Sequence, residues 1–161
     1  MRDEEFERLF EEHAGGLLGF LAYRTGDRAL AEDLLADTFE RVLRARRRFD
    51  PRRASAKTWV YSIALNLLRD QARRREAEGR ALQRVPDPAP GPGGPLEGIA
   101  DRDELGRALG RLSDEEREAI ALRYGADLTV PEIAKLQGEK LTTVEGRVYR
   151  ALRKLRGQLA E

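Results

Sequence analysis

Apolar residues recur at helical spacing in three long segments of the first half of the chain. The segments cover residues 3–24, residues 27–47 with Asp27 as a plausible cap, and a stretch from residue 55 past residue 75. The side chains expected to face inward are Phe6, Leu9, Phe10, Leu17, Phe20 and Leu21 in the first, Leu30, Leu34, Leu35, Phe39, Val42 and Leu43 in the second, and Trp59, Val60, Ile63, Ala64, Leu67 and Leu68 in the third. Because such spacing places each set on one helix face, the pattern predicts a three-helix domain.

Shorter helical segments follow in the second half. A segment at about 101–111 precedes one that opens at Ser113, with Glu116 three residues later, and Thr129 and Glu132 repeat this capping signature. A turn at Gly138 then separates a short helix from a longer basic one. Since strand-like alternation is missing from the sequence, we predict an all-α fold of two small helical domains.

Proline is concentrated between these two halves. Five of the seven prolines stand at positions 86, 88, 90, 92 and 95. Their rings forbid a helix, and the neighbouring residues offer little apolar surface to bury. We therefore expect a first domain at residues 1–78, a flexible linker at 79–100 and a second domain at 101–161.

The last two segments have the spacing of a helix-turn-helix, in which a second helix enters the DNA major groove. Residues 129–138 would pack through Ile133, Ala134 and Leu136 on Val144, Val148 and Leu152 of the longer helix. The residues left to face DNA are Thr142, Thr143, Glu145, Arg147 and Arg150. Ordinary amphipathic helix pairs share this pattern, so it does not by itself identify a DNA-binding domain.

The net charge of +1 conceals a strong separation of charge along the chain. Residues 1–40 carry 4 basic and 11 acidic side chains, whereas residues 41–75 carry 12 basic and 2 acidic ones. An arginine-rich composition alone would not leave the first forty residues so acidic. The basic block is therefore typical of a nucleic-acid contact.

The basic block also contains aromatic, amide and hydroxyl side chains. The candidate DNA-binding residues here are Arg52, Arg53, Ser55, Lys57, Trp59, Tyr61, Asn66, Arg69, Arg73 and Arg74. Cations neutralise phosphates, aromatic rings stack on bases and amides pair with base edges, which is the chemistry that single-stranded DNA requires. Trp59 is equally compatible with a core position, and the arginines at 73–75 with a solvated helix end.

Several classes of protein are disfavoured by composition. The chain has no cysteine and one histidine, His13, which leaves little for disulfides, metal sites or nucleophilic catalysis, so we expect neither catalysis nor a cofactor. Asp33 and Asp37 share a helix face but have no third ligand in register for a metal. The chain has no run of eighteen apolar residues and no signal-like start, so we expect a cytoplasmic location without membrane insertion.

Over most of its length the chain resembles the extracytoplasmic-function (ECF) sigma factors, the small sigma factors of bacterial RNA polymerase. In the first half the family pattern is matched by Ala31-Glu32-Asp33, Phe39, Thr58-Trp59, Ile63-Ala64, Asn66, Asp70 and Arg73-Arg74. In the second half it is matched by Glu132-Ile133-Ala134, Thr143-Val144 and Tyr149-Arg150-Ala151, with Leu152 and Leu155 following. Both blocks occur in the family's order around a linker, which is more specific than either block alone.

The resemblance implies a factor that binds RNA polymerase core, directs promoter recognition and supports promoter melting. The first domain would be sigma region two, docking on the clamp helices of the largest subunit through Glu32, Asp33, Leu34, Asp37 and Phe39 and receiving a flipped base of the minus-ten element. The second would be sigma region four, which reads the minus-thirty-five element and contacts the flap of the second-largest subunit. An anti-sigma factor is a further expected partner.

The sequence departs from the family pattern at several positions. Ala36 and Ala56 replace residues that are usually glutamine and phenylalanine. Around the recognition helix, Lys140, Thr142, Glu145 and Gly146 stand where the family favours serine, glycine, lysine and serine. We therefore expect an unusual or weakened upstream element. The alternative function is a stand-alone helix-turn-helix regulator, which would bind duplex DNA without polymerase.

Overall fold

The computed structural model describes residues 1–79 and 102–159, and every regular element in these two ranges is helical. The first range holds α1 (Asp3–Thr25), α2 (Arg28–Ala45), the short 3-10 turn η1 (Arg46–Arg48) and α3 (Ala56–Ala77). The second holds α4 (Arg102–Gly110), α5 (Asp114–Ile120), the π-helical turn η2 (Ala121–Gly125), α6 (Val130–Gln137) and α7 (Leu141–Leu159). The predicted all-helical, two-domain fold class is confirmed, whereas most of the expected linker, from residue 80 on, lies outside the described residues.

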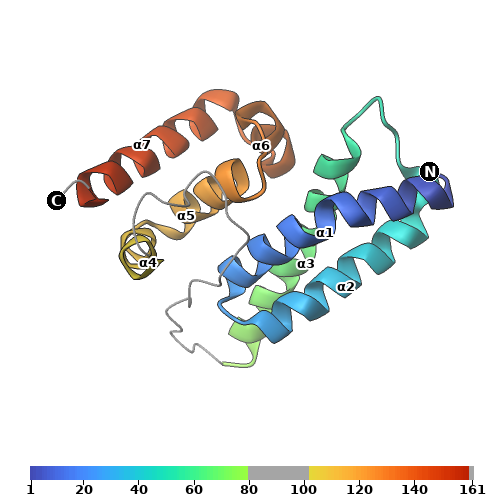
Figure 1. Cartoon of the computed structure of the whole chain (residues 1–161), viewed down its shortest axis with the longest axis horizontal. Helices are drawn as coiled ribbons and strands as arrows, with labels where there is room; N and C mark the ends of the chain where they lie inside the picture. Colours follow the sequence, from blue (N-terminus) through green and yellow to red (C-terminus); the bar gives the residue numbers. More distant parts are fainter. Residues whose placement is uncertain (80–101, 160–161) are drawn as a thin grey trace.

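The first domain is a bundle of three long helices (Figure 1). Gly26 ends α1 in the left-handed conformation, with φ of 66°, and the Asp27 side chain then accepts a hydrogen bond from the Leu30 backbone N–H at the start of α2. This tight reversal lays α2 alongside α1. Ser55 caps α3 by accepting from the Thr58 N–H at 3.1 Å.

The buried face of α3 differs from the expected one. Tyr61 and Leu65 are each 1% exposed, although we did not expect either to face inward. Trp59, Ile63 and Leu67, which we placed in the core, are only partly buried and pack at its edge. Helix α3 is covered by neighbours on more than one side, so its buried face is wider and rotated relative to a single apolar stripe.

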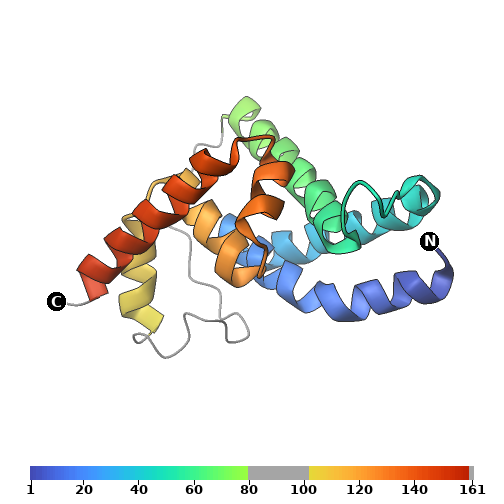
Figure 2. The same cartoon turned by 90° about the horizontal axis from the view of Figure 1, so that it is seen from above.

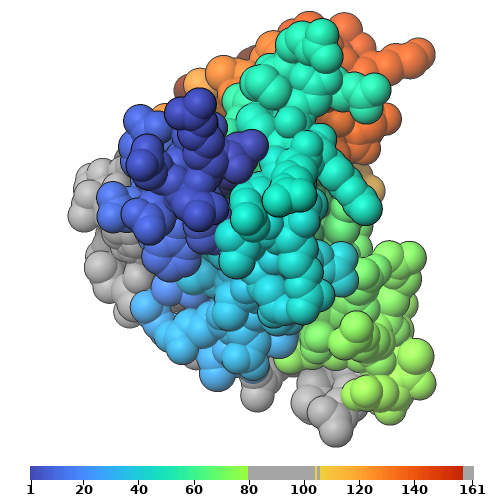
Figure 3. All heavy atoms as spheres, turned by 90° about the vertical axis from the view of Figure 1, so that its right-hand side faces the viewer, coloured from blue at the N-terminus to red at the C-terminus, as the bar shows by residue number. Residues whose placement is uncertain are grey.

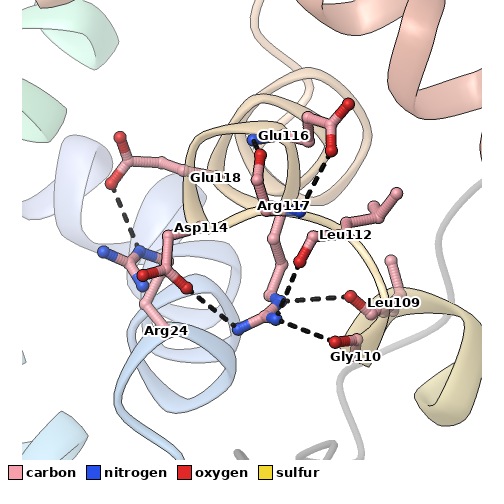
Figure 4. A network of polar contacts seen from close by, with 9 residues as sticks. Arg24, Leu109, Gly110, Leu112, Asp114, Glu116, Arg117 and Glu118 are labelled. Atoms are coloured by element: carbon pink, nitrogen blue, oxygen red, sulfur yellow. Dashed lines mark hydrogen bonds and ion pairs between the residues drawn. The ribbon is translucent and has the colours of Figure 1, made fainter.

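Helices α4, α5 and α6 of the second domain are short, and polar contacts hold their ends. Ser113 and Thr129 each form a reciprocal capping box, with Glu116 and Glu132 respectively. At the end of α4 the guanidinium of Arg117 donates to the carbonyl oxygens of Leu109, Gly110 and Leu112 (Figure 4). Gly138, with φ of 66°, ends α6 and turns the chain into α7.

The two domains lie against each other. Helix α1 contacts η2, and α3 contacts α6, as the two perpendicular views show (Figures 1 and 2). One hydrophobic cluster includes side chains from both domains, among them Leu17 and Tyr61 of the first and Leu122 and Ile133 of the second. Among the described helices, none combines the length and apolarity needed to span a membrane.

Candidate protein and nucleic-acid interfaces

The acidic residues of α2 form an exposed surface. Glu32, Asp33 and Asp37 are exposed, and Glu32 lies 3.4 Å from Arg28 in an ion pair along the helix. Leu34 and Phe39, predicted for the same surface, are instead 4% and 5% exposed and belong to the core of the bundle. Any exposed apolar side chains beside this acidic surface must therefore belong to residues other than Leu34 and Phe39.

Phe10 and Leu43 are the large apolar side chains left exposed beside this surface, at 43% and 39%. The Phe10 ring packs edge-on against Phe39 with centroids 4.9 Å apart, and Leu43 follows Phe39 by one helical turn. We had assigned both residues to the core. The sequence pattern did not indicate that either residue lies at the boundary of the core.

The loop before α3 is organised by one carboxylate. Asp50 accepts from the backbone N–H of Arg52 at 3.0 Å and from its Nε at 3.2 Å, and lies 3.9 Å from Arg53. Both arginine side chains still project into solvent, at 89% and 88% exposure. Their charges are therefore accessible to phosphates, and surface pairs of this kind cost little to break.

Trp59 lies at the start of α3, half-buried against Phe49. The ring centroids are 5.0 Å apart at an interplanar angle of 34°. Ser55 is exposed, and Lys57, two residues further along, is partly buried. This end of α3 therefore combines aromatic surface, a hydroxyl and a cation within one helical turn.

Further along α3 the predicted residues separate into two groups. Tyr61 lies in the core against Phe20, at 5.9 Å between centroids, and burial raises the pKa of its hydroxyl well above the usual range. The exposed group is Asn66, Arg69, Arg73 and Arg74. Arg73 also pairs with Asp70 at 2.6 Å. The tyrosine position is thus a core position, and the remaining polar residues form an exposed, mainly basic surface.

Helices α6 and α7 have the arrangement expected of a helix-turn-helix. Ile133, Ala134, Val144 and Val148 are buried between them. Along the outer side of α7 the exposed residues are Thr142, Thr143, Glu145 and Arg150. Tyr149 is also 64% exposed there, although we had not included it among the candidate DNA contacts.

Arg147 does not share this outer surface. Its side chain is 12% exposed, and its guanidinium donates two hydrogen bonds of 2.8 Å each to the Glu139 carboxylate and a longer one to Gln137. The hydrogen bonds and charge of Glu139 raise the pKa of Arg147, and the same contact lowers that of Glu139. In this arrangement Arg147 joins α7 to the turn that precedes it.

Polar contacts also cross between the domains. Lys57 Nζ donates to the Asp127 carbonyl oxygen at 3.2 Å, and Thr58 Oγ1 donates to Glu132 Oε2 at 3.1 Å. Separately, Arg24 Nε donates to Glu118 Oε1 at 3.2 Å, a contact visible in Figure 4. Sequence reasoning missed all three pairs. Their members lie 70 to 94 residues apart, and local pattern carries no signal for such pairings.

A metal site is not supported by the described residues, among which three or more potential ligands never cluster. Asp33 and Asp37 in particular are exposed on α2. The exposed surfaces are suited to binding other molecules. One helix presents carboxylates, and others present cations with aromatic and hydroxyl groups.

Comparison with known proteins assigns both domains. Residues 9–78 match the family described as Sigma-70 region 2, and residues 102–155 that described as Sigma-70, region 4. The ECF RNA polymerase sigma factor RpoE of Cereibacter sphaeroides is 34% identical over 161 residues, which cover 99% of this chain and 89% of that protein. The RNA polymerase sigma factor CarQ of Myxococcus xanthus is 34% identical over 159 residues, 98% of this chain and 91% of that one.

Solved structures agree with these relatives. The sigma factor RpoE of Bartonella quintana, in a co-crystal with the anti-sigma factor NepR, superposes with a TM-score of 0.80 at 26% identity, covering 98% of each chain. CnrH, in complex with the cytosolic domain of CnrY, gives a TM-score of 0.65 at 28% identity over 99% of this chain and 90% of that one. Fold and sequence thus define a two-domain transcription initiation factor. The chain belongs to the ECF sigma factors of RNA polymerase.

Proposed function

We propose that the surfaces described above bind different partners of this sigma factor. Residues 1–78 form the region-two domain, whose α2 carboxylates Glu32, Asp33 and Asp37 pair with basic residues of the polymerase clamp helices. Exposed Phe10 and Leu43 beside them supply apolar contact at the same interface. An interface of this kind combines apolar contact at its centre with charge complementarity around it.

The loop at residues 49–55 and the start of α3 are proposed to hold the minus-ten element of the non-template strand. Arg52 and Arg53 are exposed and would exchange their surface contacts with Asp50 for phosphates, and the Trp59 ring lies beside Phe49 for contact with an unstacked base. Unstacking a base costs a few kcal/mol, and a site prepared in advance offsets that cost by stacking and hydrogen bonds. Asn66, Arg69, Arg73 and Arg74 extend this surface along α3.

Residues 101–161 form the proposed region-four domain, with α7 in the major groove of the minus-thirty-five element. Thr142, Thr143, Glu145 and Arg150 are exposed there, and a glutamate in a groove can accept from a cytosine amino group. Arg147 contributes to DNA binding only after it leaves Glu139, so its main contribution in this arrangement is to position α7. The flap of the second-largest polymerase subunit is a further proposed contact of this domain.

An anti-sigma factor is a proposed regulatory partner. Support comes from the Bartonella quintana sigma factor, which was solved with its anti-sigma factor and superposes on this chain over nearly its full length. The proposed function requires no covalent chemistry from the chain itself, and its polymerase and DNA partners place it in the bacterial cytoplasm.

The observation that carries the proposal is the order of region two and region four on two helical domains, with acidic and basic surfaces separated. Run-off transcription with core polymerase and genomic fragments tests it directly. We expect transcripts that depend on this chain. Tight binding to duplex DNA without core, and no transcripts with it, would instead indicate a stand-alone regulator.

A second assay tests the basic surface. Replacing Arg52, Arg53, Arg73 and Arg74 with glutamine should weaken open-complex formation. Each lost phosphate contact should change the logarithmic salt slope by about 0.7 to 0.9. An unchanged slope would mean that these arginines contact something other than phosphate.

A further inference from the structure

The first turns of α7 carry two charged side chains that have no partner in the described part of the chain. Glu145 and Arg150 are both exposed, and neither forms a hydrogen bond or an ion pair with a described residue, including with each other. By contrast, Arg147 of the same helix is held by Glu139. Figure 3 shows orange surface of the α6–α7 region exposed at one edge of the molecule. Packing within the domain therefore does not account for Glu145 or Arg150.

Glu145 does not cap the helix either. Helix α7 begins at Leu141, and the backbone N–H groups of Thr143 and Val144 donate to the Lys140 carbonyl oxygen at 3.1 and 3.2 Å. Reciprocal capping uses the third residue of a helix, whereas Glu145 lies two residues further along. Its carboxylate is therefore free to contact a ligand.

Gly146 lies in the middle of the exposed side of α7. At about 100° per residue it is opposite the buried Val144, Val148 and Ala151. A Cβ built on Gly146 would be 3.0 Å from Arg150 Nη1 and 3.8 Å from its Cζ. The guanidinium therefore folds back along the helix to the level of Gly146, in space that the missing side chain leaves open.

α7 thus presents a carboxylate and a guanidinium at the same level, from opposite sides of Gly146. In the major groove a C·G pair presents the amino group of cytosine beside O6 and N7 of guanine, which is one donor next to two acceptors. Glutamate accepts from the cytosine amino group, and arginine donates to both guanine acceptors. An A·T pair fits less well, because its amino group lies between two acceptors that would repel a carboxylate.

We propose that Glu145 and Arg150 together specify one C·G base pair of the minus-thirty-five element, with Glu145 on the cytosine and Arg150 on the guanine. Gly146 brings the guanidinium level with the carboxylate. This inference rests on the proposed placement of α7 in the major groove. A carboxylate near phosphates weakens binding to every sequence except one that offers it a donor, so Glu145 selects by exclusion as well as by attraction.

The base preference is measured with holoenzyme, assembled from the full chain and core polymerase, on promoters with a randomised minus-thirty-five element. We expect the parent to select C·G at one position by about tenfold, because one good contact of this kind discriminates between bases by about 5-fold to 150-fold. Glu145→Ala and Arg150→Ala should each lose that preference at the same position. Both sites are exposed and alanine favours a helix, so the fold should be retained.

Two charge changes outside α7 are the matched controls. Asp114→Asn removes an exposed carboxylate and Arg111→Ala an exposed guanidinium from the connection between α4 and α5. Neither should alter the preferred sequence. Loss of preference at two different positions in the α7 variants would refute the shared base pair, and an unchanged sequence in both would refute base reading by these residues.

Affinity for two fixed promoters decides what Glu145 contributes. The promoters differ only in whether the selected position is C·G or T·A, and the parent holoenzyme should bind the first about tenfold more tightly. Glu145→Ala should bind the C·G promoter more weakly than the parent does, although the substitution removes a negative charge. If Glu145 only repelled phosphates, the variant would bind both promoters more tightly by the same factor, and the inference would be wrong.

The same selection separates this inference from the function on which it rests. If the parent chain gives no transcripts with core from any promoter of the library, the proposed function fails. Transcripts whose upstream sequences lack a C·G preference sensitive to both α7 variants would overturn the base-pair reading and leave the sigma-factor function in place.

Discussion

The two domains of this sigma factor are stabilised by different kinds of contact. The first uses helices of 23, 18 and 22 residues, each with an apolar stripe long enough to define its position. The helices α4, α5 and α6 of the second have 9, 7 and 8 residues. A helix leaves four N–H and four C=O groups without partners at its ends, and in a helix this short those are about half of its backbone polar groups.

Polar side chains therefore contribute a larger share of the stability of the second domain. It contains two capping boxes, and one arginine satisfies three carbonyl groups at the end of α4. In the first domain, side-chain caps supplement helices that already have many internal bonds. From this comparison we expect truncation of buried apolar side chains to destabilise both domains. Loss of the polar contacts at helix ends should destabilise chiefly the second domain.

The largest effect is expected from truncation of the shared core. Leu21→Ala and Leu122→Ala, both at side chains 0% exposed, should each lower the free energy of unfolding by about 2–5 kcal/mol. Urea denaturation followed by circular dichroism measures this. Leu43→Ala, at a side chain 39% exposed, is the control and should cost much less. A negligible cost at Leu122 would show that apolar packing contributes little to the second domain.

Arg117→Met should be the most damaging polar change. It leaves the carbonyl groups of Leu109, Gly110 and Leu112 without their donor, at a side chain that is 11% exposed, for a loss of about 2–3 kcal/mol. Arg111→Met is the matched control, because Arg111 is exposed at the start of the same connection. Equal stability of the two variants would refute the carbonyl-capping role.

The helix caps compare the two domains directly. Ser113→Ala and Ser55→Ala remove the same hydroxyl from the same position of a helix, with a typical cost of about 1 kcal/mol. We expect the larger loss at Ser113, because it begins a helix of 7 residues and not one of 22. Hydrogen exchange of the amides in α5 and α3 reports each helix separately, and a greater loss of protection in α3 would reverse the comparison.

Acidification should also weaken the second domain selectively. The hydrogen bonds of Glu116 with Lys154 and Ser113 lower its pKa below its ordinary value of 4.5. The stabilisation is therefore present above the unfolded-state pKa and is lost as the pH falls through the lower folded-state value. Glu116→Gln should flatten the pH dependence of the thermal midpoint below about pH 5. An unchanged slope would assign that dependence to other carboxyls.

The smallest effect, with the opposite sign, is expected at Gly146. A Cβ there would lie 3.0 Å from Arg150 Nη1, a flexible group that can move, so Gly146→Ala should gain at most about 1 kcal/mol of helix stability. The displaced guanidinium should change the preferred upstream element in a random-promoter selection. An unaltered preference would show that this glycine has no part in selecting the promoter.

Much of the fold could be predicted from local pattern. Asp27, Ser113 and Thr129 lie at helix starts and Gly138 at a helix end, because capping chemistry depends on residues within one turn. The stripe on α3 was predicted less well, since Tyr61 proved buried while Trp59 proved only partly so. The pattern gives a helix face only to within about one residue, and the partners on either side decide the rest.

The candidate surfaces show the same limit. The acidic and basic blocks were visible in the sequence, but Arg147 was predicted to face DNA and instead binds Glu139. That contact depends on the turn at Gly138, which places Glu139 beside Arg147 of α7. A charged residue on an amphipathic helix can face solvent or an ion-pair partner, and periodicity does not distinguish these.

By itself, the sequence determined the helices, most of their ends, their order and the family, because these depend on contacts within a few residues or on motif order. Only the tertiary structure decided that the two domains share a core and that Thr58 meets Glu132 and Arg24 meets Glu118. Pairs 74 and 94 residues apart are selected by the shape and charge of the packed helices, which local sequence pattern does not encode.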